Sequence, residues 1–331
     1  MRSMPKRIFI AVLGLCLLFG FCSGTFSWAQ EGYPSKPIKI MIPRDPGGAS
    51  DLAVRVMTDY LSQELKQPMI IENKGGAGGL IGISEVNKAK PDGYTLLSVA
   101  DSGMILAPLQ SPNPPFDTFK DFTPICAFGG TPVAFGVHHA SPFKTLADFV
   151  KEAKANPGKL NVAVTSIGNE NHLTFEIFRK VAAINVRLVP FKGTGEAVAA
   201  LLGKHVDMLV LTYVGFQPYV KSNEVKLLVV GSSFPGASIP NFVQAGYNDP
   251  RLRSLLDRYN TFLVSSKTPK PIYDKLVTTF KKVVTHPELT KKWETIGVIP
   301  DYLSPDELSK FMKEKWDVCS ALLDELGLKK K

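Results

Sequence analysis

Short apolar strands, each followed by a turn and an amphipathic helix, recur along this chain and restrict it to the α/β class. Ile38 to Ile42 is an apolar run, and a helix is expected from about Ser50 to Lys66. Met69 to Glu72 forms the next strand, a second helix ends near Lys88, and Tyr94 to Val99 forms a third strand. Since crossovers between strands of one sheet are right-handed, this βαβαβ order predicts a parallel sheet.

The middle of the chain repeats this order. Thr145 opens a helix that reaches Ala155, and Asp148 three residues later completes a capping box. The segment from Gly231 to Asn260 is rich in turn residues and is expected to be irregular. Further strands and helices are predicted at 160–164, 171–183, 186–190, 195–202, 206–211, 261–264, 271–285, 287–296 and 305–326.

This length predicts two lobes, because about 300 residues exceed what one core usually serves. The boundaries between the two lobes are expected near Phe128 to Val133 and near Asp257 to Phe262. We therefore expect a discontinuous first lobe at 30–130 and 258–331 and a second lobe at 131–257. Ligands of open α/β sheets bind beyond the carboxyl ends of the strands, so two facing lobes share one cleft.

The first 29 residues form a targeting segment. Arg2, Lys6 and Arg7 precede a run of about 14 apolar residues, which is shorter than the roughly 20 of a membrane span. Ala29 fits the position before a cleavage site, and an uncleaved anchor is the alternative. Cleavage removes three basic residues and no acids, so the charge falls from +9 to +6. This excess either attracts anionic ligands or only aids solubility, and an exported protein does not meet nucleic acid.

Four turns carry the candidate binding residues. In the first, Gly47 and Gly48 allow close backbone approach, and the helix beginning at Ser50 directs free N–H groups to the same point, where an anion would bind. A plain turn from strand to helix would use the same residues. The turn from Thr165 to His172 is dense in donors and acceptors, with N-capping as the alternative function. A fourth turn lies at 190–195, and Asp207 begins a strand, where it would serve as a structural acceptor.

The remaining turn, from Asn73 to Gly79, resembles a dinucleotide cradle only superficially. A G-x-G-x-x-G pattern that starts at Gly76 places Ile81 at the third glycine, and no acid follows about 20 residues later. A flexible loop at the edge of the lobe fits these residues better than a cofactor site. We expect no cofactor.

Signatures of catalysis and of metal binding are missing from the sequence. It contains neither G-x-S-x-G nor H-E-x-x-H. The adjacent His138 and His139 would point to opposite faces of a strand and make a poor metal pair. After cleavage Cys126 and Cys319 remain, either as a disulfide or as buried thiols. We expect no enzymatic activity and no metal.

Several short motifs follow one another along nearly the whole mature chain. They are Tyr33-Pro34-Ser35-Lys36-Pro37-Ile38, Pro46-Gly47-Gly48-Ala49-Ser50-Asp51, 72–79, 91–97, 121–125, 168–173, 189–193 and Val206-Asp207. In this order they resemble the periplasmic receptors of tripartite tricarboxylate transporters, also called the Bug family. Their number and order make the resemblance specific.

The resemblance implies a two-lobed α/β periplasmic-binding-protein (Venus flytrap) fold, each lobe being a mostly parallel sheet flanked by helices. It implies a periplasmic, non-enzymatic receptor, which we expect to be a monomer, that captures a small carboxylate and delivers it to a membrane permease. A ligand-sensing adaptor of the same fold that signals to a membrane kinase is the alternative, and a nucleotide-dependent enzyme is a more distant one. The implied ligand-binding residues are Pro46, Gly47, Gly48, Ser50, Ser166, Gly168, Asn169, Glu170, Asn171, Lys192, Gly193 and Asp207.

The chain departs from the family at three places. Family members usually carry an aromatic and an uncharged residue where this chain has Arg44 and Asp45, and Ser or Thr where it has Asn169. The run Pro-Thr-x-x-Glu-x-Gly is missing from 231–260. Our hypothesis is that Arg44 contacts a carboxylate and that Asp45 contacts a ligand amine or hydroxyl.

Overall fold

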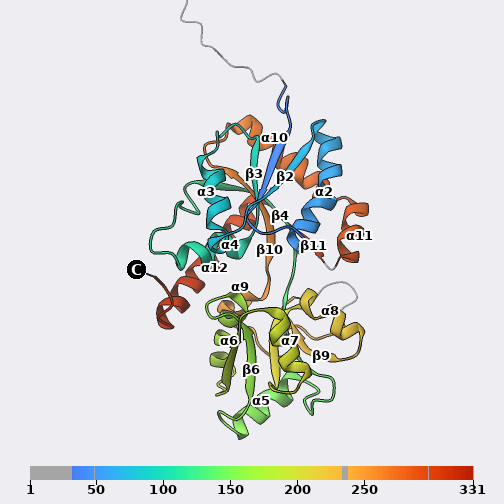
Figure 1. The fold of residues 1–331 in the computed structure, drawn as a ribbon, viewed down its shortest axis with the longest axis vertical. Helices are drawn as coiled ribbons and strands as arrows, with labels where there is room; N and C mark the ends of the chain where they lie inside the picture. The colour runs from blue at the N-terminus through green and yellow to red at the C-terminus, as the bar shows by residue number, and fades with distance from the viewer. Residues whose placement is uncertain (1–31, 48, 233–237, 297, 331) are drawn as a thin grey trace, which may run out of the picture. The chain divides into compact units, whose positions relative to one another are not determined.

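The computed structural model describes residues 32–330, except 48, 233–237 and 297 (Figure 1). The following concerns the compact unit that begins at Lys36. The predicted targeting segment at 1–29 lies outside the described residues. In the part of the chain that is described, no helix is both long and apolar enough to cross a membrane.

The first sheet has the strand order β11-β4-β10-β3-β1-β2. β1 pairs in parallel with β2 and β3, whereas β10 runs antiparallel to β3 and β4, and β11 antiparallel to β4. The strands are β1 Ile38–Ile42, β2 Met69–Asn73, β3 Thr95–Ala100, β4 Phe122–Gly130, β10 Tyr259–Ser265 and β11 Ile299–Leu303. The helices that accompany them are α2 Ala49–Leu65, η1 Ala77–Gly79, α3 Leu80–Lys88, α4 Asp101–Leu109, α10 Lys270–Val284, α11 Pro287–Thr295 and α12 Pro305–Glu325.

The second sheet has the strand order β7-β6-β8-β5-β9. β6 pairs in parallel with β7 and β8, and β5 pairs antiparallel with β8 and β9. The strands are β5 Val133–His138, β6 Asn161–Thr165, β7 Arg187–Phe191, β8 Met208–Thr212 and β9 Val225–Val230. The accompanying helices are α5 Leu146–Ala155, α6 Glu170–Val181, α7 Thr194–Leu202, α8 Tyr213–Lys221 and α9 Pro250–Leu256.

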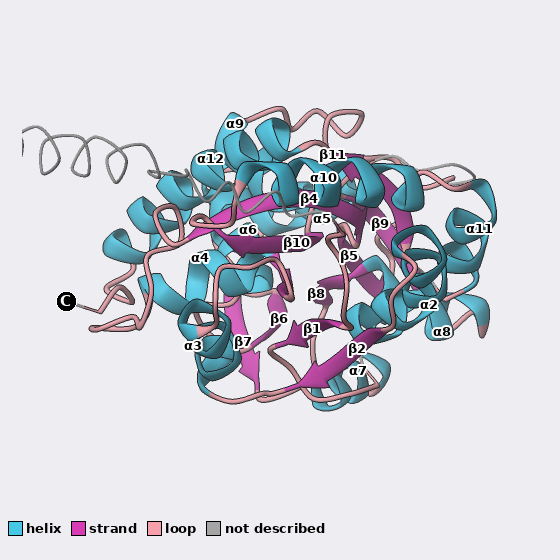
Figure 2. Cartoon of the chain, turned by 90° about the horizontal axis from the view of Figure 1, so that it is seen from above, coloured by secondary structure: helices cyan, strands magenta, loops and turns pink. Residues whose placement is uncertain are grey.

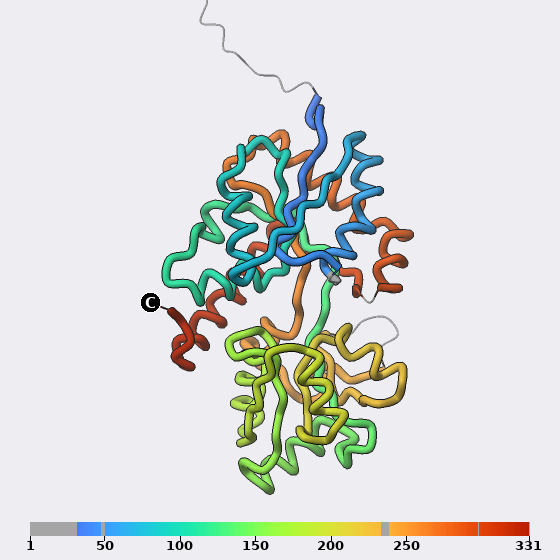
Figure 3. The backbone as a smooth tube through the Cα atoms, in the orientation of Figure 1, coloured from blue at the N-terminus to red at the C-terminus, as the bar shows by residue number. Residues whose placement is uncertain are grey.

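Helices surround the strands of both sheets, as expected for the α/β class (Figure 2). The chain passes from the first sheet to the second between β4 and β5, and returns between α9 and β10 (Figure 3). These two crossing segments lie side by side, because Thr131 N–H donates to the carbonyl oxygen of Arg258 at 2.9 Å. The two-sheet α/β fold is thus confirmed. The sheets are mixed, since the strands next to the crossings run antiparallel to their neighbours.

Aromatic side chains form a separate packed group on each sheet. Phe128 and Phe262 stack with ring centroids 4.8 Å apart, and buried Trp293 donates its indole N–H to the Ala53 carbonyl at 3.0 Å, which joins α11 to α2. In the second sheet Phe135 contacts Phe178 at 5.0 Å. Such pairs add to the free energy of burying the rings, so each sheet has its own aromatic core.

Local signals predicted some helix ends well and others poorly. The capping box at Thr145 is present, and α5 begins one residue later. The helix expected from about Ser50 begins one residue earlier, at Ala49. The segment expected to be irregular contains α9, because Asp249 caps it and Pro250 occupies its first position.

Candidate ligand-binding site

A cavity of about 230 Å³ lies where the two sheets meet the crossing segments. Its walls come from the carboxyl ends of β1 and β3, the first turns of α2, α4 and α6, and both crossing segments. Residues from both sheets therefore contribute. The lining residues are Ile42, Arg44, Asp45, Ser50, Asp51, Ala100, Ser102, Thr131, Glu170, Arg258, Tyr259 and Asn260.

Asp51 holds the first turn in place. Its buried carboxylate accepts hydrogen bonds from the Gly47 N–H at 2.9 Å, from Arg55 Nε at 2.8 Å and from Asn73 Nδ2 at 2.9 Å. Burial tends to raise the pKa of Asp51, but these hydrogen bonds and the Arg55 charge hold that pKa below its usual value. Asn73 also donates to the Arg44 carbonyl at 3.3 Å. The loop is thus fixed by the Asp51 carboxylate, which joins it to α2 and to the end of β2.

The glycine-rich segment after β2 packs against this first turn. A Cβ on Gly75 would lie 2.8 Å from Asp45 Oδ1, and one on Gly82 would lie 2.7 Å from the Lys74 carbonyl oxygen and 3.0 Å from Pro43 Cα. A Cβ on Gly82 would collide with backbone atoms, whereas one on Gly75 would require the exposed Asp45 side chain to move. Close packing of two loops therefore accounts for these glycines without a nucleotide.

In the second sheet, the turn before α6 is held by its own side chains. Asn169 caps α6 by accepting from His172 N–H at 3.0 Å. The side-chain amides of Asn169 and Asn171 both donate to Thr165 Oγ1, at 3.0 and 2.8 Å. Gly168 N–H donates to His172 Nδ1 at 3.1 Å, so buried His172 supports the turn. The capping alternative therefore describes Asn169, whereas Asn171 lies within α6 and bonds to Thr165 and to Arg258.

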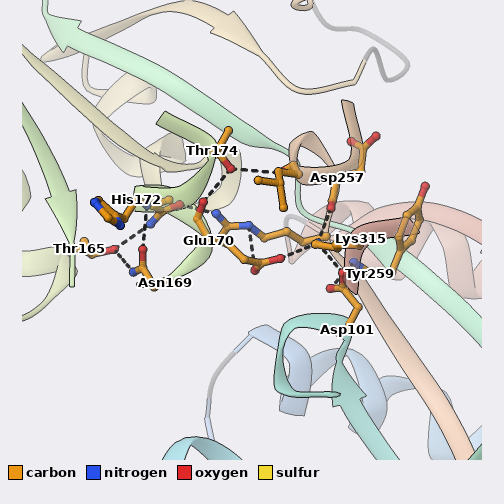
Figure 4. A network of polar contacts seen from close by, with 12 residues as sticks. Asp101, Thr165, Asn169, Glu170, His172, Thr174, Asp257, Tyr259 and Lys315 are labelled. Carbon is orange, nitrogen blue, oxygen red and sulfur yellow. Dashed lines mark hydrogen bonds and ion pairs between the residues drawn. The ribbon is translucent and has the colours of Figure 1, made fainter. Parts of the chain in front are cut away.

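A fully buried lysine on α12 connects the second sheet to the first (Figure 4). Lys315 Nζ lies 2.5 Å from both Asp101 Oδ2 and Glu170 Oε1, and it donates to the Asp257 carbonyl at 3.1 Å. Arg258 forms a second ion pair with Glu170, with its Nε 3.3 Å from Oε2. We call Asp101, Glu170, Arg258 and Lys315 the ion cluster.

Burial and the neighbouring charges together determine the pKa values of the carboxyl groups in the ion cluster. It raises the pKa of Asp101 to about 6, a rise that the Glu170 charge adds to and Lys315 opposes. Burial would also raise the pKa of Glu170, but Lys315 and Arg258 hold that pKa below its usual value. Glu170 therefore stays ionised at neutral pH.

Four of the predicted site residues line the cavity: Arg44, Asp45, Ser50 and Glu170. Ser50 donates through Oγ to Asn260 Oδ1 at 2.6 Å. Gly48 lies outside the described residues. The predicted residues that do not line the cavity are Pro46, Gly47, Ser166, Gly168, Asn169, Asn171, Lys192, Gly193 and Asp207.

The resemblance places Asp207 in the site, but the structure puts it elsewhere. Asp207 directly precedes β8 and so lies at the amino end of that strand, and its carboxylate accepts from Asn161 N–H at 2.7 Å. It lines a different cavity, of about 750 Å³. Asp207 is therefore a structural acceptor, the function its strand position alone suggested.

Ser166, Lys192 and Gly193 lie at the carboxyl ends of β6 and β7, the edge of the sheet at which α6 begins. The Ser166 N–H donates to the Phe191 carbonyl at 2.9 Å, so the two turns are neighbours. Ser166 and Lys192 are exposed. Both turns thus belong to the edge that contributes Glu170 to the cavity.

Several lining residues were missed by sequence reasoning. Just before the predicted strand at 261–264 lies a polar run, Arg258, Tyr259 and Asn260. This position was the one feature of the sequence that could have marked them as site residues. Ser102 and Thr131 gave no signal.

Cys126 and Cys319 are buried free thiols in the structure, not a disulfide. Among the described residues, no cluster of three His, Cys, Asp or Glu is placed to hold a metal ion.

Comparison with known proteins identifies relatives along most of the chain. A family model described as the tripartite tricarboxylate transporter family receptor matches residues 53–328. A protein encoded in the gbd 5′ region of Cupriavidus necator is 31% identical over 335 residues, covering 99% of each chain. A solved structure described as a periplasmic transporter is 32% identical with a TM-score of 0.71, covering 90% of this chain and 99% of the other.

A further structure is similar in fold. MatC from Rhodopseudomonas palustris, solved with bound malate, has a TM-score of 0.66 and 24% identity, covering 88% of this chain and 100% of that protein.

Proposed function

This chain belongs to the tripartite tricarboxylate transporter receptor family, and we propose that it captures a small carboxylate between two lobes and delivers it to the membrane subunits of such a transporter. The family is one of solute-binding receptors, which is not a class of enzyme, and its members work with membrane partners. The proposed lobes are 30–130 with 258–331, and 131–257.

The cavity shared by the two sheets is the observation that carries this proposal. Arg44 lines it, and so do Ser50 and Asp51 in the first turn of α2. Helix N-termini and guanidinium groups both favour anions, so a carboxylate fits this wall. Glu170 and Arg258 also line the cavity. Closure of two lobes about a hinge brings such walls onto a ligand.

Ser166, Lys192 and Gly193 are the second-lobe residues that we propose to meet the ligand when the lobes close. They share the sheet edge of Glu170, and Lys192 and Ser166 are exposed there. Gly193 is the N-cap of α7 and has open space where a Cβ would point, so nothing there blocks a ligand from approaching the N-terminus of this helix. Asp207 lies at the far end of its strand and is not part of the proposed site.

Export to the periplasm, cleavage after Ala29 and action as a monomer complete the proposal. The basic and apolar segments at 1–29 support export, and the family is that of a periplasmic transporter receptor. N-terminal sequencing of the secreted protein tests the cleavage site, and sedimentation tests the monomer.

A thermal-shift screen of the mature protein tests carboxylate binding directly. The panel contains mono-, di- and tricarboxylates, aromatic acids, amino acids and nucleotides. A ligand at 100 times its Kd stabilises the folded state by about 2.7 kcal/mol, which raises the melting temperature by a few degrees.

Arg44→Gln should abolish this shift, whereas the matched control Arg253→Gln, an exposed arginine on α9, should retain it. If no carboxylate changes the melting temperature and nucleotides do, the receptor proposal is wrong.

A further inference from the structure

The charges around the cavity divide into compensated and uncompensated groups. Asp51 is neutralised by Arg55, whose Nε lies 2.8 Å from its carboxylate. In the ion cluster, Asp101 and Glu170 balance Lys315 and Arg258. Each of these groups is neutral at pH 7 when all its members are ionised. None of them therefore needs an ion from a ligand.

Arg44 and Asp45 are the two charges on the cavity wall that remain. Among the described residues, neither side chain makes a hydrogen bond or an ion pair, although both line the cavity. The Asp45 carboxylate lies over Gly75, where a Cβ would come within 2.8 Å of its Oδ1. One loop thus presents a cation and an anion side by side, both exposed to solvent.

Closure of the site removes water from both charges, and a buried charge without a counter-ion is costly. A dicarboxylate would neutralise Arg44 but leave the Asp45 carboxylate buried and repelled by the second acid group. A hydroxyl would give Asp45 a hydrogen bond but no opposite charge. An ammonium group supplies both.

We propose that the ligand is a small zwitterion whose carboxylate binds Arg44 and whose ammonium group binds Asp45. This inference rests on the proposed receptor function. The cavity of about 230 Å³ favours a small molecule, since pockets for drug-sized ligands hold roughly 300–1,000 Å³. An amino acid has this chemistry, and it carries no net charge into the neutral remainder of the site.

Isothermal titration calorimetry with matched sets of ligands tests the inference. The probes are the proteinogenic amino acids, and for the four-carbon and three-carbon skeletons also the hydroxy and unsubstituted acids: aspartate, malate and succinate, then alanine, lactate and propionate. We expect an amino acid to bind at least about tenfold more tightly than its hydroxy and unsubstituted counterparts.

Asp45→Asn should weaken binding of the amino acid at least about tenfold while leaving the weaker binding of malate and lactate unchanged or improved. Arg44→Gln should weaken all carboxylates. Asp59→Asn, at an exposed position of α2, removes the same charge away from the cavity and should change neither. Circular dichroism melts of the variants confirm that they fold.

The outcomes separate this inference from the receptor proposal. If acids without an amine bind and no amino acid does, or if Asp45→Asn leaves amino-acid binding unchanged, the zwitterion inference fails and the receptor proposal stands. If no carboxylate of any kind binds, both fail.

Discussion

Replacing Lys315 by methionine removes the charge at the centre of the ion cluster while keeping a side chain of similar length. Lys315 and Asp101 are completely buried, and the lysine lies 2.5 Å from each of two carboxylates. Removing one member of a buried ion pair costs about 3–5 kcal/mol, because the remaining charge stays buried without its partner. Here Glu170 would keep its contact with Arg258, whereas Asp101 would lose its partner cation.

This loss predicts a lower melting temperature for Lys315→Met. For domains of this size, about 1 kcal/mol corresponds to a change of roughly 2–4 °C, so the melting temperature should fall by roughly 6–20 °C. The matched control is Lys313→Met, an exposed position on the same helix, which should change stability by no more than about 0.5 kcal/mol.

Differential scanning calorimetry of the ligand-free variants measures the effect, and urea unfolding gives the free energy. The double variant Asp101→Asn with Lys315→Met should regain part of the loss, because it removes the carboxylate that Lys315→Met leaves without a cation. A single variant that melts within 2 °C of the Lys313→Met control would refute the argument that these charges depend on one another.

Three further variants test other parts of the structure. Asp51→Asn should cost about 1.5–3 kcal/mol by urea unfolding at pH 7, since Asp51 loses charge-assisted hydrogen bonds such as that from Gly47. The pKa of Asp51 is lower in the folded protein than its unfolded value of about 3.9, so the ionised carboxylate stabilises the fold above that pH and this stabilisation is lost as the pH falls further. A difference in unfolding free energy between wild type and variant that is as large at pH 2 as at pH 7 would contradict this reasoning. Gly75→Ala should displace the Asp45 carboxylate and weaken ligand binding in calorimetry with little change in melting temperature, and unchanged affinity would contradict the packing. Thr145→Ala should cost about 0.5–2 kcal/mol by chemical denaturation, and no loss would mean that the capping box contributes nothing to the free energy of folding.

Local patterns predicted the elements whose ends carry their own signals. The strand at 38–42 and the helix at 146–155 have the predicted bounds, because a proline–glycine turn and a capping box mark them. β4 and β5 were missed because their antiparallel pairing depends on β10, β8 and β9, which are distant in sequence. Pairing of this kind leaves no signal in a short window.

The residues of the site likewise divide into those that the sequence could identify and those that it could not. Arg44, Asp45 and Ser50 could be placed because a turn between strand and helix has a recognisable composition. Asn260 could not, since its contact with Ser50 joins residues 210 positions apart. Lys315 is one lysine among several on an amphipathic helix, and only the packed structure shows that it is buried.

The hydrogen bond between Thr131 and Arg258 joins the two places where the chain passes between the sheets. Both residues also line the cavity, together with Tyr259 and Asn260. Any turning of one sheet against the other must twist the backbone at these points. A ligand bound in the cavity, as we propose, would therefore contact the hinge between the lobes directly. Substitutions of these residues should then change both the rate at which the lobes open and the ligand specificity.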